Sequence, residues 1–325
     1  MKKPILLHYY ITNRCNARCA FCDIWREQPK VDALLSDVAA NLTQARAAGC
    51  RFVDFTGGEP LLHPDLPEFL RQAKKAGLMT SVTTNCLLFE ERAEELAGLI
   101  DLPHFSIDAD SAELHDKIRG CQSYGKVLKS IDAALANRIY PDLLFTYTEE
   151  NIDAVEGVWK LAKKKRLILI LDPVFAIWGP DKVSPDVHRK AVDFAKRRGV
   201  YLNRAHLLLR DKGGNRTRDP ICRAASSTIV ITPDGNLALP CYHHRCAAVK
   251  IAGNLAQALR SDERIDALNK EGRYAFCEGC HINCYFDPTY QMMSGRFLWE
   301  SMKCKAKYVL TKYLLYRRPY FFKSF

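Results

Sequence analysis

Short apolar runs rich in β-formers alternate with longer amphipathic segments through the first 175 residues of the chain. The first amphipathic segment carries apolar side chains at helical spacing, at Leu34, Leu35, Val38 and Leu42. The pattern predicts strands at residues 5–11, 52–55, 80–82, 104–107, 143–147 and 167–171. It predicts helices between them at residues 32–48, 64–76, 90–100, 124–137 and 152–164.

Repeated strand–helix units of this kind build a parallel sheet with right-handed crossovers, so the predicted fold class is α/β with a partial (β/α)6 TIM-like barrel. The carboxyl ends of the strands then share one rim, where parallel barrels hold their active sites. Glycines or polar residues stand at or just after the end of each predicted strand: Asn13, Gly57, Gly58, Glu59, Asn85, Ser106, Asp108, Thr146 and Asp172.

The pattern changes beyond residue 175. A helix is expected at 185–198 and a strand at 201–209, followed by a polar loop at 210–219. This loop is either a domain boundary or a lid over the substrate. A β-hairpin is then expected from 228–232 and 237–239, because the Asp234-Gly235 pair between them is a strong turn signal.

Composition places the protein among ordinary globular chains that can bury a full core, with 325 residues of which 48% are hydrophobic. There are 13 cysteines, and the apolar run near the start is broken at Asn13 and Arg14, so no secretory signal is recognised. We therefore expect a reducing, cytoplasmic location, where clustered cysteines more often bind metal or do chemistry than form disulfides. No run of about 18 apolar residues predicts a transmembrane helix.

The net charge of +11 is concentrated at the end of the chain. From Lys303 onward there are seven basic residues and no acidic ones, interleaved with tyrosine and phenylalanine. This segment is either a last helix packed on the barrel or a peripheral contact with an anionic membrane. The first 300 residues are only mildly basic, which makes nucleic acid an unlikely partner.

The candidate chemistry starts with Cys15, Cys19 and Cys22, spaced at i, i+4 and i+7 directly after the first strand. Three thiolates on one loop can surround one small iron–sulfur or zinc centre. Two alternatives stay open at this point: the same spacing is one face of a helix, on which cysteines would simply pack, and zinc would need a fourth ligand that does not lie nearby.

These residues resemble the cluster loop of the radical S-adenosylmethionine (radical SAM) enzymes, with Phe21 before the last cysteine. Further segments match in order over roughly residues 5–175: Gly57-Gly58-Glu59-Pro60, Thr83-Thr84-Asn85, Ser106-Ile107-Asp108 and His115 to Gly120. The resemblance implies a [4Fe–4S] cluster held by Cys15, Cys19 and Cys22, with one open iron that binds S-adenosylmethionine.

The resemblance also implies which residues contact S-adenosylmethionine. Gly57, Gly58 and Glu59 are expected to bind its methionine amino group, the glycines because they let a ligand approach the backbone closely. Ser106 and Asp108 are expected at its ribose hydroxyls or methionyl group, with Asn85 in a similar role. Arg119 is expected to pair with its carboxylate or, alternatively, to be a surface charge.

Later cysteines resemble a twitch or SPASM-type extension. Cys222, Cys241, Cys277 and Cys280 have the order and approximate spacing of the ligands of one auxiliary [4Fe–4S] cluster. Two auxiliary clusters, or a zinc ribbon at Cys277 and Cys280, are the alternatives. Cys246, Cys284 and Cys304 are left without a role, and Cys50, Cys86 and Cys121 are expected to pack.

We therefore predict a radical SAM enzyme with a barrel at residues 1–210, an auxiliary-cluster domain at 220–304 and a basic aromatic tail at 305–325. The expected substrate is a peptide or protein, with a lipid or small metabolite as the alternative, and a flavodoxin or ferredoxin as reductant. Asp172 is the candidate base for a substrate proton. The competing class is a non-enzymatic iron–sulfur or zinc protein that transfers electrons or binds nucleic acid.

Overall fold

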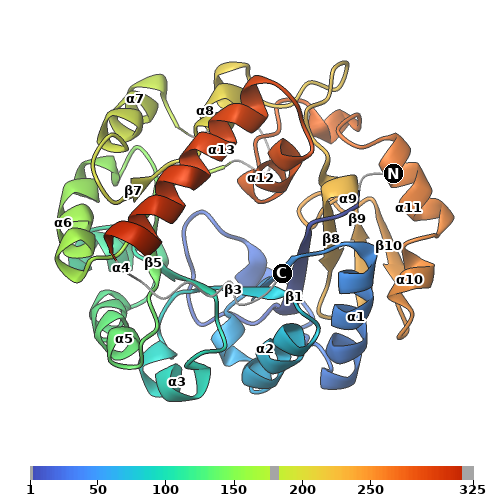
Figure 1. The fold of residues 1–325 in the computed structure, drawn as a ribbon, viewed down its shortest axis with the longest axis horizontal. Helices are drawn as coiled ribbons and strands as arrows, with labels where there is room; N and C mark the ends of the chain where they lie inside the picture. Colours follow the sequence, from blue (N-terminus) through green and yellow to red (C-terminus); the bar gives the residue numbers. More distant parts are fainter. Residues whose placement is uncertain (1–2, 176–182, 317–325) are drawn as a thin grey trace.

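The computed structural model describes residues 3–175 and 183–316 of the chain (Figure 1). Their strands form one sheet that curves into an open barrel, with helices around its outer face. The strands are β1 (Leu6–Thr12), β2 (Phe52–Gly57), β3 (Met79–Thr84), β4 (Leu102–Ser106), β5 (Asp142–Tyr147), β6 (Leu169–Pro173), β7 (Val200–Tyr201), β8 (Thr228–Ile231), β9 (Asn236–Leu239) and β10 (Ala247–Lys250).

The strand order is β10-β9-β8-β1-β2-β3-β4-β5-β6-β7. Strands β1 to β7 pair in parallel with their neighbours, which confirms the six predicted strands and the predicted α/β fold class. The predicted hairpin is formed by β8 and β9, and β8 also pairs in parallel with β1. The sheet of the barrel therefore continues directly into the cysteine-rich segment, and its two ends, β10 and β7, leave it open.

Thirteen α-helices cover or extend the described sheet. They are α1 (Leu35–Ala48), α2 (Leu66–Lys75), α3 (Phe89–Leu96), α4 (Ala112–Arg119), α5 (Tyr124–Ala136), α6 (Val155–Lys165), α7 (Pro185–Phe194), α8 (Arg204–Asp211), α9 (Ala224–Ser227), α10 (Leu255–Ala258), α11 (Asp262–Asn269), α12 (Asn283–Gln291) and α13 (Arg296–Val309). All the helices predicted before residue 200 are present.

Alternation along the strands separates an apolar outer core from a polar barrel interior. In β2, Val53 and Phe55 are fully buried under the helices, whereas Asp54 faces the other way. Asp54 Oδ2 lies 3.2 Å from Nδ1 of His8 on β1. The His8 ring also packs edge-on against Tyr285 of α12, which lies at the open side of the curved sheet in Figure 1. The interior face of the barrel therefore carries polar side chains, including His8 and Asp54.

One prediction of local structure was wrong, and one helix was not predicted. The segment 201–209 is a strand only at Val200–Tyr201, and α8 then follows. Asn203 begins this helix because its side chain accepts a hydrogen bond from the backbone N–H of Ala205 at 3.1 Å. Helix α4 was not predicted, because its second half, from His115 onward, was interpreted only as part of a chemical motif. Ser111 caps α4, and Gly120 ends it in the left-handed conformation.

The basic segment at the end of the chain is helical as far as it is described, and α13 continues into a π-helical turn at Leu310–Leu315. Lys312 Nζ lies 2.8 Å from both carboxylate oxygens of Asp142, at the start of β5. Helix α13 therefore packs on the barrel at the amino-terminal ends of its strands. Residues 317–325 of the predicted tail lie outside the described residues. Among the described helices, none is both long enough and apolar enough to cross a membrane.

Candidate cofactor site

The loop between β1 and α1 carries Cys15, Cys19 and Cys22 as free, half-buried thiols. The segment that holds them is not helical, which excludes the alternative that they form one face of a helix. Burial raises the pKa of the Cys15 thiol to about 11 and also raises that of Cys22. As free groups these two thiols stay protonated at neutral pH, and a bound metal would displace their protons.

The cysteine loop is fastened to the end of α4. The backbone N–H of Arg18 donates to the carbonyl of Arg119 at 3.0 Å, and that of Ala20 to the carbonyl of Ile118 at 3.0 Å. A side chain on Gly120 would meet the Arg18 carbonyl oxygen at 2.5 Å, so the contact needs glycine there. The helix that sequence reasoning missed is therefore the support of the cysteine loop.

Gly57 and Gly58 hold the other side of the same loop. A Cβ on Gly57, whose φ is +133°, would lie 1.9 Å from the Thr12 carbonyl oxygen, and one on Gly58 would lie 2.0 Å from the Arg14 carbonyl oxygen. The backbone N–H of Gly58 donates to that Thr12 oxygen at 2.8 Å. The glycines were expected to admit a ligand; in this structure the group that approaches them is the cysteine loop itself.

Glu59 is buried, and hydrogen bonds from the protein occupy both of its carboxylate oxygens. Oε1 accepts from the backbone N–H of Leu61 at 3.0 Å and from the Thr84 hydroxyl at 2.8 Å. Oε2 accepts from the backbone N–H of Asn85 at 2.8 Å. Glu59 thus ties the loop after β2 to the end of β3. Asn85 in turn donates from Nδ2 to Oδ1 of Asn16, in the cysteine loop, at 2.8 Å.

Arg119 and Asp108 form an ion pair at the same rim, with Nη2 2.5 Å from Oδ2. Both side chains are buried, so the alternative that Arg119 is a surface charge is wrong. Nη1 of Arg119 lies 3.6 Å from Cys19 Sγ, and the guanidinium stands over the Phe21 ring at 5.6 Å. The pair places a positive charge beside one candidate ligand, where it would stabilise a thiolate. Ser106, the last residue of β4, is buried nearby in sequence.

The four later cysteines come together. Cys222, Cys241, Cys277 and Cys280 line one pocket with His244, Tyr285 and Phe286. Burial, together with the neighbouring thiols, raises the pKa of Cys241 and of Cys277 to about 12. Four soft donors facing one space are a donor set suited to an iron–sulfur cluster.

Asn215 organises this pocket and was missed by the sequence analysis, which placed it in a polar loop. Its Oδ1 accepts from the backbone N–H of Cys222 at 3.0 Å, and its Nδ2 donates to the carbonyl of Cys277 at 3.1 Å and of Gly272 at 2.8 Å. Its backbone N–H donates to the carbonyl of Cys280 at 2.8 Å. A fully buried asparagine with four such partners holds the Cys222 segment and the Cys277–Cys280 segment together. Its only sequence signal is an uncharged amide side chain among the charged residues of the loop at 210–219.

Asp172 lies at the end of β6, away from the cysteine loop along the sheet. Its Oδ1 accepts from Asn283 Nδ2 at 2.6 Å, and it lines a small cavity of about 50 Å³ with Tyr201 and His206. Burial raises the Asp172 pKa to about 7, with Arg210 acting in the opposite direction. A carboxyl group with this pKa can exchange a proton near neutral pH.

The remaining cysteines stand outside these two sets. Cys50 and Cys86 are fully buried, as expected for packing residues, and Cys304, for which no role was predicted, is buried on α13. Cys121 is partly buried and Cys246 is exposed. His244, which lines the pocket of the four later cysteines, stacks on Phe276 with ring centroids 5.0 Å apart. Within the described residues, no three His, Cys, Asp or Glu side chains are arranged to hold a single metal ion.

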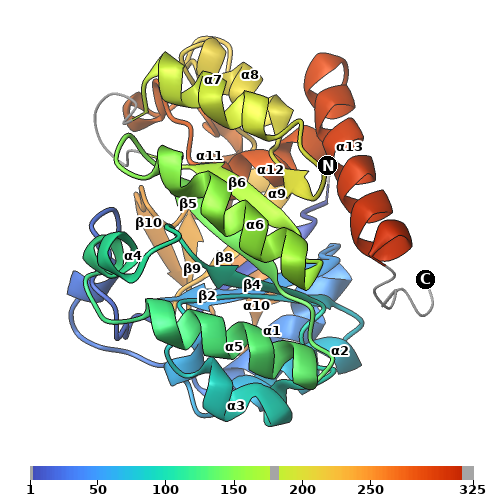
Figure 2. The same cartoon turned by 90° about the vertical axis from the view of Figure 1, so that its left-hand side faces the viewer.

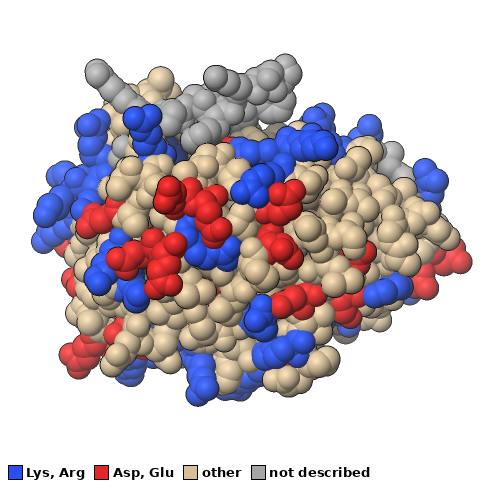
Figure 3. Space-filling model, turned by 90° about the horizontal axis from the view of Figure 1, so that it is seen from below, with Lys and Arg blue, Asp and Glu red and all other residues tan. Residues whose placement is uncertain are grey.

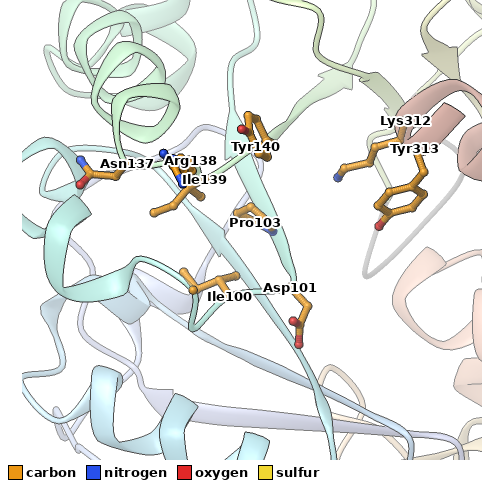
Figure 4. Close-up of a pocket in the computed structure, with 10 residues that line it drawn as sticks. Ile100, Asp101, Pro103, Asn137, Arg138, Ile139, Tyr140, Lys312 and Tyr313 are labelled. Carbon is orange, nitrogen blue, oxygen red and sulfur yellow. The ribbon is translucent and has the colours of Figure 1, made fainter. Parts of the chain in front are cut away.

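A separate cavity of about 310 Å³ lies between β4, β5 and the end of α13 (Figure 4). Asp101 and Pro103 come from the start of β4, Arg138 and Tyr140 precede β5, and Lys312 reaches in from the opposite side. These are amino-terminal strand ends, whereas the cysteine loop follows the carboxyl end of β1. The cavity is therefore not part of the candidate cofactor site.

Comparison with known proteins identifies the class. The family model described as the Radical SAM superfamily matches residues 9–162. The chain thus carries a radical SAM domain at residues 9–162. The match covers β1 to α6, which includes the cysteine loop, the Gly57-Gly58-Glu59 segment and the Arg119–Asp108 pair.

Several curated proteins are similar in sequence. Fe-coproporphyrin III synthase of Methanosarcina barkeri is 25% identical over 207 residues, 61% of this chain and 52% of that protein. The probable GTP 3′,8-cyclase of Methanocella arvoryzae is 33% identical over 187 residues, 56% of this chain and 60% of that protein. The chain thus spans between half and two thirds of these two relatives. The Sulfolobus acidocaldarius probable GTP 3′,8-cyclase is 26% identical over 83% of this chain and 91% of its own length.

Solved structures share the fold. Streptococcus suis SuiB bound to precursor peptide SuiA superposes with a TM-score of 0.67 at 16% identity, over 91% of this chain and 74% of that chain. Native anSMEcpe with bound AdoMet and the Cp18Cys peptide gives a TM-score of 0.61 at 18% identity, over 94% of this chain and 97% of that chain. At these identities the likeness establishes the architecture.

Proposed function

We propose that the protein is a radical SAM enzyme that abstracts hydrogen from a peptide or protein. The observation that carries the proposal is the set of three free thiols, Cys15, Cys19 and Cys22, on one loop held between Gly57-Gly58 and the end of α4. When bound there, a [4Fe–4S] cluster with an open iron supplies the electron that cleaves S-adenosylmethionine to methionine and a 5′-deoxyadenosyl radical. The chain supplies position and shielding.

The roles of the other rim residues follow from their contacts. Glu59 is a positioning residue, because its carboxylate oxygens are taken by the protein. Backbone groups of Gly57 and Gly58, together with Asn85 and Ser106, are proposed to contact S-adenosylmethionine. Asp108 holds Arg119, whose remaining donors can face the carboxylate of S-adenosylmethionine.

We further propose that Cys222, Cys241, Cys277 and Cys280 bind one auxiliary [4Fe–4S] cluster, in a domain that starts near residue 220. Their convergence on one pocket supports this assignment, and so does the Asn215 network behind them. Cys284 is the second residue of α12, and its carbonyl accepts a hydrogen bond from His8 Nε2 on β1 at 3.1 Å. Iron analysis separates about eight irons per chain for two clusters from about four for one.

Asp172 is proposed to collect a proton released by the substrate. It lies at the carboxyl end of β6, and its side chain is hydrogen-bonded to Asn283 of the cysteine-rich segment. A reductant such as a flavodoxin or ferredoxin would supply electrons to the enzyme. On the face in Figure 3, basic and acidic side chains are interspersed, which does not favour a nucleic-acid partner on that face.

The test of the proposal is anaerobic purification, cluster reconstitution, and incubation with dithionite and S-adenosylmethionine. We expect 5′-deoxyadenosine from the native chain and none above background from Cys15→Ala. Cys50→Ala is the matched control, since Cys50 is buried in the outer core beyond the rim. Equal product from native protein and Cys15→Ala would defeat the proposal and favour a non-enzymatic metal protein.

The substrate class needs a second experiment. A peptide or protein is supported by SuiB and anSMEcpe, whose structures hold a precursor peptide and a Cp18Cys peptide. A small metabolite is supported by the relatives named GTP 3′,8-cyclase. Formation of 5′-deoxyadenosine should rise with peptide pools from the source cell and stay unchanged with GTP. Stimulation by GTP alone would replace the first candidate with the second.

A further inference from the structure

Helix α13 continues into the π-helical turn Leu310–Leu315, and the two together, called α13 below, present an apolar stripe to solvent. Trp299, Met302, Leu310, Leu314 and Leu315 are exposed by 61, 48, 51, 66 and 49%, and they account for five of the eight large hydrophobic side chains that are exposed in the described residues. Spacings of three, eight and four residues from Trp299 to Leu314 keep most of them on one side of the helix. A concentration of this kind on one element marks an interaction surface.

The stripe cannot turn inward, because the opposite face of the helix is anchored by polar contacts. Lys312 is buried with its ammonium 2.8 Å from both oxygens of Asp142, and the Tyr308 hydroxyl donates to the same carboxylate at 2.5 Å. Lys305 pairs with Asp287 of α12 at 2.9 Å. The usual arrangement of a surface helix, apolar inside and charged outside, is therefore partly inverted here.

The charges around the stripe are almost all positive. Arg296, Lys303 and Lys307 are exposed on the same helix. Its single acidic residue, Glu300, lies 3.6 Å from Arg204 and 3.7 Å from Lys303 and is therefore neutralised. Lysine is depleted in the cores of protein–protein interfaces, whereas apolar residues flanked by lysine and tryptophan are typical of helices that lie on anionic lipid.

We propose that the outer face of α13 docks on an anionic lipid surface, with Trp299, Met302, Leu310, Leu314 and Leu315 in the acyl boundary and the cations at the headgroups. In Figure 2, α13 stands at the outer edge of the molecule, and the loop after β1 lies beside α4 at the opposite edge. Docking through α13 therefore leaves the cysteine loop facing away from the lipid. The surface anchors the protein and does not feed lipid to the candidate active site.

The test is flotation of the anaerobically purified full chain with vesicles. Native protein should float with vesicles of phosphatidylglycerol and phosphatidylcholine, and much less with phosphatidylcholine alone or at high salt. Leu310→Glu/Leu314→Glu should lower the bound fraction by roughly ten-fold or more. The matched control is Leu34→Glu/Ile265→Glu, which changes two equally exposed apolar side chains, 66 and 48%, on other elements. The control should float as native protein does.

Three results would overturn the proposal. The first is that native protein fails to float with anionic vesicles, and the second is that the α13 variant floats as well as the control. The third is that native protein is a dimer in solution which only the α13 variant converts to monomer, because a second copy would then cover the stripe. Circular dichroism and 5′-deoxyadenosine formation in both variants show that folding and the proposed activity are retained, so failure here is distinct from failure of the proposed function.

Discussion

Arg119 and Asp108 face each other at 2.5 Å across the rim of the barrel, and their side chains are only 9 and 0% exposed. Asp108 Oδ1 also accepts from the backbone N–H of Thr146 at 2.9 Å, and the Asp108 N–H donates to His115 Nδ1 at 3.1 Å. Burial and the Arg119 charge lower the His115 pKa to about 4, so this ring is neutral and can accept. The ion pair thus joins the loop after β4 to β5 and to α4.

Asp108→Asn should destabilise the protein by about 3–5 kcal/mol, because it leaves the Arg119 guanidinium buried without its partner charge. The free energy of unfolding is measured by denaturant titration under anaerobic conditions, and 5′-deoxyadenosine formation should also fall. The control is Lys117→Ala on the same helix, whose pair with Glu150 is exposed. It should change little. Equal effects of the two variants would show that the Arg119–Asp108 pair has no special role.

Gly58→Ala should prevent assembly of the cluster on the cysteine loop. The new methyl group would lie 2.0 Å from the Arg14 carbonyl oxygen, a backbone atom that cannot move without displacing the loop. We expect loss of about four irons per reconstituted chain and of the associated visible absorbance. Gly125→Ala is the matched control, because a Cβ there meets nothing within 4 Å and alanine favours the helix. Full iron content in Gly58→Ala would contradict the prediction.

Asn215→Asp should empty the auxiliary pocket while leaving the first cluster in place. The two amide donors to the carbonyls of Cys277 and Gly272 would be replaced by a carboxylate oxygen that repels them. Iron should fall by about four per chain, and 5′-deoxyadenosine formation without substrate should persist. Asn254→Asp is the control, because Asn254 caps α10 as an acceptor and aspartate caps equally well. Loss of both clusters would show a general folding defect instead.

Asp172→Asn should change how stability depends on pH. Burial raises the Asp172 pKa to about 7 from its ordinary value near 4, so the folded state holds a proton that the unfolded state releases. The Asp172 proton therefore makes the free energy of unfolding of the native chain fall as pH rises from about 4 to about 7. Above about pH 7 this contribution no longer changes. The difference between native protein and Asp172→Asn, measured by denaturant titration across this range, should follow that slope. A flat difference would place the Asp172 pKa near its ordinary value.

Much of the fold was readable in the sequence because the outer core follows local periodicity. Val53 and Phe55 alternate with Asp54, and this alternation marks a strand with one covered face whatever its neighbours are. The prediction of a strand at 201–209 was wrong because the short apolar run there fits the period of a strand and that of a helix. The cap at Asn203 favours the helix. The position of β8 beside β1 could not be read at all, since strand pairing is a long-range choice.

The sequence by itself determined the candidate ligands of this protein, which are three thiols at one spacing and four at another. It also supplied the Gly57-Gly58 pair. Only the tertiary structure decided how they are held. It brought Gly58 against Arg14, Arg119 against Asp108, and Asn215 between the later cysteines. The physical reason is that ligand type and spacing are local properties of a chain. The partners of a buried charge or amide are chosen by packing, from residues that can stand anywhere in it.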